Sequence, residues 1–409
     1  MAGLRPLAMA VILMALLSTL PGYPARAGVV PAATPCPCPW AGIYPTVVTP
    51  WCSHGGVDVP ALERQLNYEL QGGVRGVLVL GTIGEGQYAT EPERDQVVAT
   101  AVRIACHTPV IVGIHTCNVQ WAKYEMLKAR NLGAAAVLVK YLGNPHASAD
   151  EVFGFYAALS DMHILPVFYY HYPRQTGLHL SAQAVADILR LPGIVGIKES
   201  TLNLHEMQAH IRLTCGLGKA YFTSTALNLT QFLALGGQGA MCPEAVLAPA
   251  AVVQTYHAYV HGQHDEARTL QQALFVLEPI VGSSPLPAAV SRPVEMTAAD
   301  HKMPLPLGPN HPQARIKMAL TCIGVETPTA VNCALPALKW RDRRRVKSAV
   351  SRLKDIDWCE VAFKVPPVPL HACPELDEGG MLLRTGGIQL GPGTQENMVG
   401  WQGDGKGGF

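Results

Sequence analysis

The sequence predicts an α/β protein that folds as a (β/α)8 TIM barrel with a C-terminal helical extension, and three observations predict it. Eight short apolar runs rich in Val and Ile recur between residues 42 and 242, as expected of strands buried on both faces of a parallel sheet. Longer segments with helical periodicity separate most of these runs, which favours parallel pairing. No Gly-x-Gly-x-x-Gly sequence follows the first run, which disfavours a doubly wound nucleotide-binding sheet.

The expected elements follow in order along the chain. The strands are the eight apolar runs, Gly42–Thr49, Gly76–Leu80, Pro109–Ile114, Ala135–Lys140, Leu165–Tyr170, Ile194–Lys198, Ala220–Ser224 and Gly239–Cys242. The helices between them are the amphipathic stretches Asp58–Leu70, Glu91–Ala105, Val119–Leu132, Ala149–Leu159 and Ser181–Leu189, in which the apolar residues share one face. After the eighth strand, the same patterning predicts helices at Ala245–Val260, Asp265–Val281, Gln313–Ile323 and Asp342–Leu353.

The first 40 residues differ from the rest in their pattern of apolar and small residues, and they are interpreted as a signal-like leader and linker. An apolar run from Leu7 to Leu20 follows Arg5, and the small residues Ala25 and Ala27 suit cleavage by a signal peptidase. The alternative is an upstream extension without a structural role. The run is too short to span a bilayer comfortably, so no membrane span is expected once the leader is removed.

The domain boundaries follow from these patterns. The barrel is expected over residues 41–262 and the C-terminal helices over 263–355, with a Pro-rich insertion at 283–312. Residues 356–409 are Pro-rich and then Gly-rich, which predicts a disordered tail.

The composition excludes several classes of partner. Of the 409 residues, 15% are charged and 49% are hydrophobic, and the formal net charge is +1. A low charged fraction indicates a well-buried globular body, and a balanced charge leaves no electrostatic footprint for nucleic acid. The basic run Arg341–Arg345, interrupted by Asp342, is interpreted as the solvated face of a helix.

Catalytic groups of parallel barrels lie at the carboxyl ends of the strands. The second apolar run is followed by Gly81, Thr82, Ile83, Gly84 and Glu85. Its glycines would let backbone N–H groups approach an anion such as a carboxylate. The alternative interpretation is a tight turn between a strand and a helix.

Two further strand ends carry side chains suited to catalysis. Lys198 ends the sixth run, where burial would disfavour its ammonium form and free the amine to attack a carbonyl. The alternative is a lysine that reaches solvent or pairs with Glu199. Tyr170 ends the fifth run, where its phenol could relay protons or simply pack in the core. A desolvated lysine, a phenol and an anion-binding turn are together the parts needed for Schiff-base chemistry on a 2-oxo acid.

These residues stand within a longer pattern that resembles a known family. The pattern comprises Gly42-Ile43-Tyr44-Pro45-Thr46-Val47-Val48-Thr49-Pro50, Gly55-Gly56-Val57-Asp58, Gly81–Glu85, Tyr170 with Pro173 and Thr176-Gly177, Gly196-Ile197-Lys198-Glu199-Ser200, and Gly236-Gly237-Gln238-Gly239. It resembles the dihydrodipicolinate synthase/N-acetylneuraminate lyase superfamily of class I, pyruvate-dependent aldolases over residues 41–282, and more loosely over 312–355.

The resemblance implies a role for each matched residue. Lys198 would form the imine, Tyr170 would be the acid and base, and Thr82 would supply the hydroxyl that connects to this tyrosine. The backbone at Thr82 and Ile83 would hold the substrate carboxylate, next to Gly81. The resemblance further implies a 2-oxo acid and an aldehyde as substrates, no metal or diffusible cofactor, and a homo-oligomer (tetramer or dimer). By family default it also implies a cytoplasmic location, but the leader-like N-terminus leaves the localisation open.

The chain departs from the family pattern at four substrate-facing positions. Ile83 replaces a second hydroxyl residue, and Gln175 stands where the synthases place an arginine that grips a second carboxylate, with Arg174 displaced by one. Leu142 stands in place of one of two paired tyrosines, and Thr225 lies where substrate-reading acidic residues would be expected. These departures predict an aldolase or related lyase that is neither an authentic dihydrodipicolinate synthase nor a sialic-acid lyase, with Gln175 and Thr225 among its substrate-binding residues.

Two other functions stay open at this point. Ile83, Leu142 and Ala226 would also suit a barrel that binds or senses a small 2-oxo acid with impaired catalysis, since fold alone does not fix function. A metal-dependent aldolase would need ligands such as His115, His171 and Glu85, although no paired histidine spacing supports a site.

Overall fold

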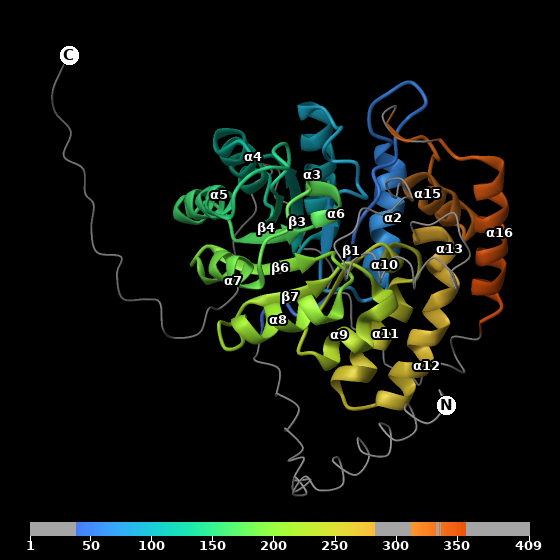
Figure 1. Cartoon of the computed structure of the whole chain (residues 1–409). Helices are drawn as coiled ribbons and strands as arrows, with labels where there is room; N and C mark the ends of the chain where they lie inside the picture. The colour runs from blue at the N-terminus through green and yellow to red at the C-terminus, as the bar shows by residue number, and fades with distance from the viewer. Residues whose placement is uncertain (1–37, 283–311, 333–334, 336, 357–409) are drawn as a thin grey trace, which may run out of the picture. The chain divides into compact units, whose positions relative to one another are not determined.

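The computed structural model describes residues 38–282, 312–332, 335 and 337–356. The chain divides into two units after Val368, and every described residue belongs to the first. The predicted leader falls almost wholly outside the described residues, as do the Pro-rich insertion and the tail. The unit contains eight parallel strands with helices between them (Figure 1), which confirms the predicted (β/α)8 barrel. The strands are β1 (Gly42–Pro45), β2 (Val77–Val79), β3 (Val110–His115), β4 (Ala136–Lys140), β5 (Val167–His171), β6 (Ile194–Glu199), β7 (Ala220–Thr223) and β8 (Gly239–Cys242).

The sheet closes through β1, which pairs with β8 on one side and touches β2 on the other. The order is β1-β8-β7-β6-β5-β4-β3-β2, and a parallel bridge between Thr46 and Leu78 completes the circle. Close approach of β1 and β8 requires a glycine, because a Cβ atom at Gly239 would lie 1.9 Å from the carbonyl oxygen of Gly42.

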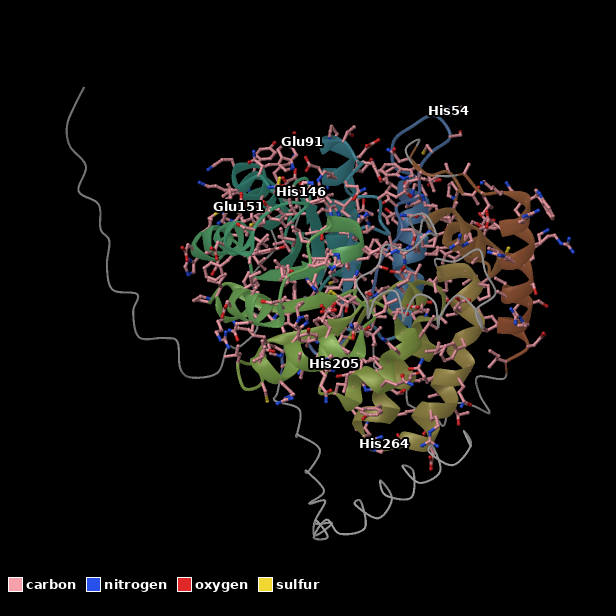
Figure 2. The ribbon with its side chains drawn as sticks, in the orientation of Figure 1. His54, Glu91, His146, Glu151, His205 and His264 are labelled. Atoms are coloured by element: carbon pink, nitrogen blue, oxygen red, sulfur yellow. The ribbon has the colours of Figure 1, made fainter. Side chains whose placement is uncertain are left out.

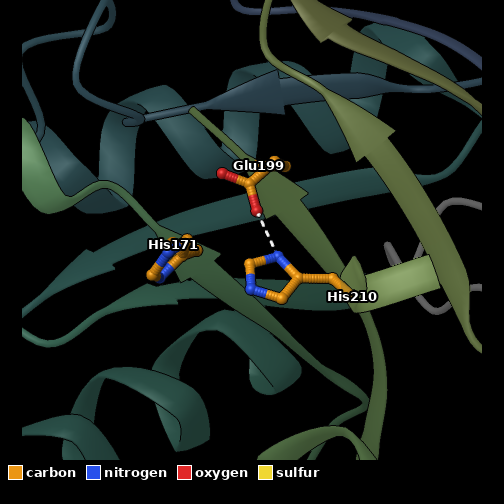
Figure 3. Close-up of side chains that lie close together, drawn as sticks. All are labelled: His171, Glu199 and His210. Atoms are coloured by element: carbon orange, nitrogen blue, oxygen red, sulfur yellow. Dashed lines mark hydrogen bonds and ion pairs between the residues drawn. The ribbon is translucent and has the colours of Figure 1, made fainter. Parts of the chain in front are cut away.

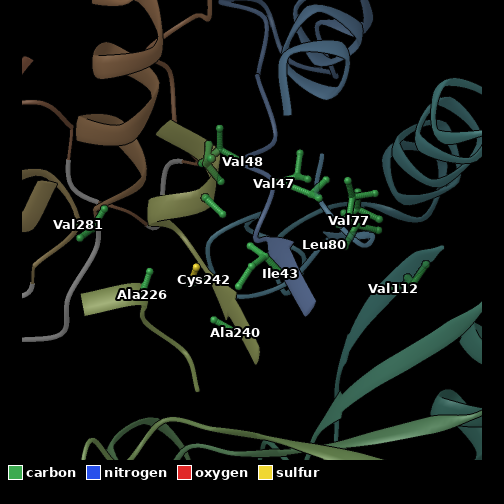
Figure 4. Packing of buried hydrophobic residues seen from close by; sticks show 14 of the residues in the cluster. Ile43, Val47, Val48, Val77, Leu80, Val112, Ala226, Ala240, Cys242 and Val281 are labelled. Atoms are coloured by element: carbon green, nitrogen blue, oxygen red, sulfur yellow. The ribbon is translucent and has the colours of Figure 1, made fainter. Parts of the chain in front are cut away.

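Alternate side chains of each strand separate into two apolar cores. Tyr44, Phe168 and Phe222 belong to the cluster inside the barrel. The second cluster lies between the strands and the surrounding helices, and includes Ile43 and Val112 (Figure 4). Inward positions near the carboxyl ends of the strands are therefore the places where functional side chains can meet.

The helices follow the strands as the periodicity predicts. Side-chain oxygens of Asp58, Asn118, Ser148, Ser181 and Asn203 accept hydrogen bonds at their first turns. The helices that surround the barrel are α2 (Val59–Gln71), α3 (Glu91–Ala105), α4 (Val119–Asn131), α5 (Ala149–Asp161), α6 (Pro173–Thr176), α7 (Ala182–Arg190), α8 (Leu204–Thr214), η1 (Ala226–Asn228), α9 (Leu229–Ala234), α10 (Glu244–Leu247) and α11 (Pro249–Val260).

The C-terminal helices form where they were predicted, but one expected helix is interrupted. The helix expected over Asp265–Val281 is divided into α12 (His264–Leu274), η2 (Phe275–Leu277) and α13 (Glu278–Val281), where Pro279 occupies the first turn of α13 and cannot continue an earlier helix. The helices α15 (Gln313–Cys322) and α16 (Trp340–Lys354) pack on each other. None of the helices in the described part of the chain combines the length and apolarity that a membrane crossing needs.

Candidate active site

The inward side chains at the carboxyl ends of β4, β5 and β6 meet at one mouth of the barrel. Tyr170 and Lys198 are direct neighbours in the register of β5 and β6, and the Lys198 Nζ atom lies 4.7 Å from the centroid of the Tyr170 ring. The structure therefore brings together the lysine and the tyrosine that the sequence singled out.

Lys198 has the surroundings of a nucleophilic amine. Its side chain is 3% exposed, and burial lowers its pKa to about 7, although Cys242 and Glu244 act in the opposite direction. At neutral pH, much of this amine is uncharged and able to attack a carbonyl carbon. Glu199, the adjacent residue, is not its counter-ion, because its carboxylate pairs with His210 at 3.0 Å on the outer face of the strand.

Tyr170 is held as a protonated phenol beside this amine. Burial raises its pKa, and the hydroxyl groups of Ser200 and Thr82 offset part of that effect. A phenol in contact with a hydroxyl residue can pass a proton toward or away from a bound substrate. Thr82 thus lies where the sequence predicted it, next to the tyrosine.

The turn after β2 is built around an unusual backbone conformation at Leu80. This residue has φ 55°, which a bulky side chain rarely adopts. Glycines make room for it, since a Cβ atom at Gly86 or Gly113 would lie 2.0 or 2.3 Å from the Leu80 carbonyl oxygen. Arg94, paired with the buried Glu125, donates to the carbonyl oxygens of both glycines at 2.7 and 3.2 Å. The turn that begins at Gly81 is therefore fixed from two sides.

This turn contains two backbone donors without an acceptor. No described residue accepts a hydrogen bond from the backbone N–H of Thr82 or Ile83, whereas the Thr82 carbonyl oxygen accepts from Gln313 Nε2 at 3.1 Å. Ile83 is partly buried against the outer core and its side chain supplies no donor. Two neighbouring N–H groups without an acceptor are compatible with the anion-binding turn expected from the glycine pattern, which stays a prediction.

Lys140 is a second buried lysine at the mouth, and the sequence reasoning missed it. The residue is 0% exposed and its Nζ atom lies 5.7 Å from the Tyr170 ring centroid. Burial, followed by the charge of Lys198, lowers its pKa to about 7. The signal was present, because the expected strand Ala135–Lys140 ends in a lysine as the sixth strand does, and the rule used for Lys198 applies equally to it.

The predicted specificity residues Gln175 and Thr225 have different partners in the structure. Gln175, in the short helix α6, accepts a 2.5 Å hydrogen bond from Lys140 Nζ and also lies within 3.5 Å of the Thr82 hydroxyl. Thr225, after β7, donates to the buried Glu244 at 2.5 Å. Gln175 is thus part of the lysine cluster, whereas the Thr225 hydroxyl holds a carboxylate that acts on Lys198.

The side chains considered for a metal do not converge. His115 Nε2 is 2.9 Å from the Leu80 carbonyl oxygen, and Glu85 forms an ion pair with Lys317 at 2.6 Å in which neither side chain is exposed. Among the described residues, the group that could hold an ion is instead His171, Glu199 and His210 (Figure 3). It lies behind the strands, away from the mouth.

The His171, Glu199 and His210 group is a tightly bonded internal network. Burial would raise the pKa of Glu199, but the two imidazoles and the N–H of Thr201 hold it at about 2. Tyr169 and Tyr221 add hydrogen bonds to His171 and Glu199. The six histidines and glutamates labelled in Figure 2 lie instead on the surface. The network fixes the residue next to Lys198 and therefore the direction of that lysine.

A cavity of about 260 Å³ lies at the opposite end of the barrel. It is lined at the amino-terminal ends of the strands by residues that include Gly42, Arg75 and His107. Since functional groups of parallel barrels collect at the carboxyl ends, we place the active site at the mouth that holds Lys198.

The fold and this mouth define a class of protein: barrel enzymes of the lyase and aldolase type, with an amine and a phenol buried together at the carboxyl ends of adjacent strands. The model of the Dihydrodipicolinate synthetase family matches residues 39–323, and the chain belongs to this family. The 4-hydroxy-tetrahydrodipicolinate synthase of Hyphomonas neptunium is 29% identical over 294 residues, which cover 70% of this chain and 99% of that relative. The synthase of the same name from Methanosphaerula palustris is 31% identical over 253 residues, 60% of this chain and 86% of its own.

Solved structures agree on the fold. The dihydrodipicolinate synthase of Thermotoga maritima superposes with a TM-score of 0.67 at 22% identity, covering 78% of this chain and 99% of that one. The dihydrodipicolinate synthase of Acinetobacter baumannii, complexed with pyruvate, gives 0.67 at 23% identity and covers 78% and 100%. These likenesses concern the barrel and its C-terminal helices.

Proposed function

We propose that the chain is a Schiff-base-forming lyase or aldolase that acts on pyruvate or another 2-oxo acid, by carbon–carbon cleavage or condensation. The observation that carries the proposal is the buried Lys198 amine, with its pKa lowered to about 7 by burial, in contact with the Tyr170 ring. Two relatives bear the name of a synthase in this family, and one solved neighbour was complexed with pyruvate.

The chemistry uses the groups at the mouth in a fixed order. The neutral Lys198 Nζ attacks the C2 carbonyl carbon, and a C–N bond forms while the carbonyl oxygen takes up a proton. Loss of that oxygen as water then gives a protonated imine, which acts as an electron sink when a bond to C3 is made or broken. Tyr170 and Thr82 move protons during these steps, and the free N–H groups of Thr82 and Ile83 receive the substrate carboxylate.

We propose further that the second substrate differs from that of an authentic dihydrodipicolinate synthase. Support comes from Gln175, which carries no charge at the position where the synthases are expected to have an arginine, and whose amide oxygen is already engaged by Lys140 at 2.5 Å. Leu142 likewise supplies no phenol. The aldehyde partner would therefore be held by different contacts.

A homo-oligomer, tetramer or dimer, stays part of the proposal. Trp121, Tyr124 and Phe153 are 45%, 40% and 38% exposed on the neighbouring helices α4 and α5, and exposed aromatic residues of this kind are frequent in interfaces between subunits. The N-terminal leader that bears on localisation stays a prediction.

Borohydride trapping tests the proposed function directly. The protein is incubated with pyruvate and with a panel of other 2-oxo acids, reduced with borohydride, digested and mapped by mass spectrometry. We expect an irreversible adduct on Lys198, absent from Lys198→Met and present in Lys123→Met, which removes an exposed lysine of α4. No adduct with any member of the panel would refute Schiff-base chemistry, and adduct formation without turnover of any aldehyde would favour the binding barrel.

A further inference from the structure

Lys140 is buried at the mouth with neutral acceptors only. Its Nζ atom donates to Thr82 Oγ1 at 3.0 Å, to Gln175 Oε1 at 2.5 Å and to Gln87 Oε1 at 3.4 Å. No carboxylate among the described residues forms an ion pair with it. A buried ammonium without a counter-ion is strongly unfavourable, so the site is built to receive an anion or to lose the proton.

The titratable groups that face Lys140 from neighbouring strands carry no negative charge at neutral pH. Lys198 of β6 is a second cation when protonated and lowers the pKa of Lys140. Tyr170 of β5 is a phenol whose pKa is raised by burial, and His115 of β3 is a neutral imidazole whose pKa burial holds well below its usual range. The carboxylate of Glu244 acts on Lys198. The pocket around Lys140 is therefore electropositive whenever this amine is protonated.

The unpaired donors of the turn after β2 lie next to this amine. Lys140 Nζ is hydrogen-bonded to the side chain of Thr82, and the backbone N–H groups of Thr82 and Ile83 have no acceptor among the described residues. One carboxylate can accept from both backbone donors and from an ammonium, because its two oxygens offer about four acceptor sites. Such charge-assisted bonds are the strong ones.

We propose that Lys140 is a specificity-determining residue that binds the carboxylate of the 2-oxo acid, together with the N–H groups of Thr82 and Ile83. The inference rests on the proposed function. Ile83 supplies no side-chain donor to the substrate carboxylate, and Lys140 would supply one in its place. It also predicts a pH dependence. Burial lowers the pKa of free Lys140 to about 7, and a bound carboxylate favours the ammonium form. Carboxylate recognition is therefore strong below about pH 7 and fades as the pH rises above it.

The test compares pyruvate with its methyl ester, in which a methyl group caps the carboxylate and removes its charge. Pyruvate and its uncharged methyl ester both present a C2 carbonyl to Lys198, so borohydride trapping gives a half-saturating concentration for each. In the unmodified protein we expect pyruvate to be preferred and the preference to shrink between about pH 6 and about pH 9. In Lys140→Met we expect the half-saturating concentration of pyruvate to rise about tenfold and that of the ester to change little. The preference for pyruvate is then expected to be independent of pH.

Controls separate this role from a structural one. If Lys140 only ties Thr82 to Gln175, its loss will weaken both probes equally, and an unchanged ratio of half-saturating concentrations would overturn the inference. Lys123→Met removes an exposed lysine and is expected to keep the ratio. Lys140→Gln keeps a polar side chain and serves as the test variant if Lys140→Met lacks a cooperative unfolding transition. Absence of any adduct in the unmodified protein would instead refute the proposed function.

Discussion

Reactivity of single residues at this mouth depends on which face of a strand carries them. Tyr170 and Lys198 point inward, toward each other, whereas their neighbours Tyr169 and Glu199 point outward into a hydrogen-bonded network. Because side chains alternate along a strand, the phenol of Tyr170 lies at the site and that of the adjacent Tyr169 lies in the network behind it.

Substitution of Tyr170 by phenylalanine tests the proton relay. Tyr170→Phe removes the phenol and keeps the ring against Lys198, so we expect the borohydride adduct with pyruvate to persist. Turnover of an accepted aldehyde is expected to fall by about 10²- to 10⁴-fold, the usual effect of losing a general acid or base. The measurement is kcat beside the yield of adduct.

Tyr169→Phe is the matched control for this substitution. It removes the same hydroxyl one residue away, where the phenol bonds His171 at 2.7 Å on the outer face. We expect lower stability and nearly unchanged kcat. Equal losses of kcat in both variants would show that the phenol of Tyr170 has no special role in proton transfer.

At the scale of elements, helix α15 belongs to the site as much as the strands do. Gln313 bonds the Thr82 carbonyl oxygen, and Lys317 pairs with Glu85 in the same turn. Trp51 Nε1 adds a hydrogen bond to this glutamate at 2.8 Å. The glutamate that ends the glycine-rich pattern is thus a structural anchor between the barrel and its C-terminal extension.

Breaking the pair between Glu85 and Lys317 tests this anchor. Lys317→Met leaves a buried carboxylate without its cation, and we expect the free energy of unfolding to fall by about 3–5 kcal/mol. The double variant Glu85→Gln/Lys317→Met removes both charges and is expected to recover part of this loss. Urea unfolding of the three proteins measures the effect, and a loss as large in the double variant as in the single one would contradict it.

For the molecule as a whole, the two buried lysines of the mouth, Lys140 and Lys198, link activity to stability. Each has a pKa of about 7 in the folded chain and about 10.4 when unfolded. Between these values the unfolded chain binds more protons than the folded one, so stability rises with pH across the window from about 7 to about 10. Below about pH 7 both lysines are charged in both states, and the full cost of burying them is present.

Lys140→Met should therefore stabilise the protein at neutral pH. We expect a higher urea midpoint than that of the unmodified protein at pH 7, with the difference shrinking toward pH 10 because unfolded lysine also becomes neutral there. A variant that is less stable across the whole range would show that the bonds from Lys140 to Thr82 and Gln175 outweigh the cost of its burial. Lys123→Met is expected to follow the unmodified protein at every pH.

The sequence predicts the barrel well because buried parallel strands leave continuous apolar runs, and the inward position of Lys198 and Tyr170 follows from strand ends alone. It predicts contacts between distant segments poorly. The pairing of Glu85 with Lys317 spans 232 residues, and no local pattern signals it. The strand expected over Gly42–Thr49 stops at Pro45, and the next residue, Thr46, forms only an isolated bridge to Leu78 of β2.

The anchor between Glu85 and Lys317 also bears on how the protein is made. Translation releases the strands in order from β1 to β8, and domains form as their parts leave the ribosome. The turn that holds Thr82 and Ile83 contains a buried carboxylate whose cation lies in α15, so it cannot reach its final form until Lys317 has emerged. We expect a nascent chain that carries all eight strands but not α15 to remain unable to bind its substrate, so that completion of the mouth waits for the C-terminal extension.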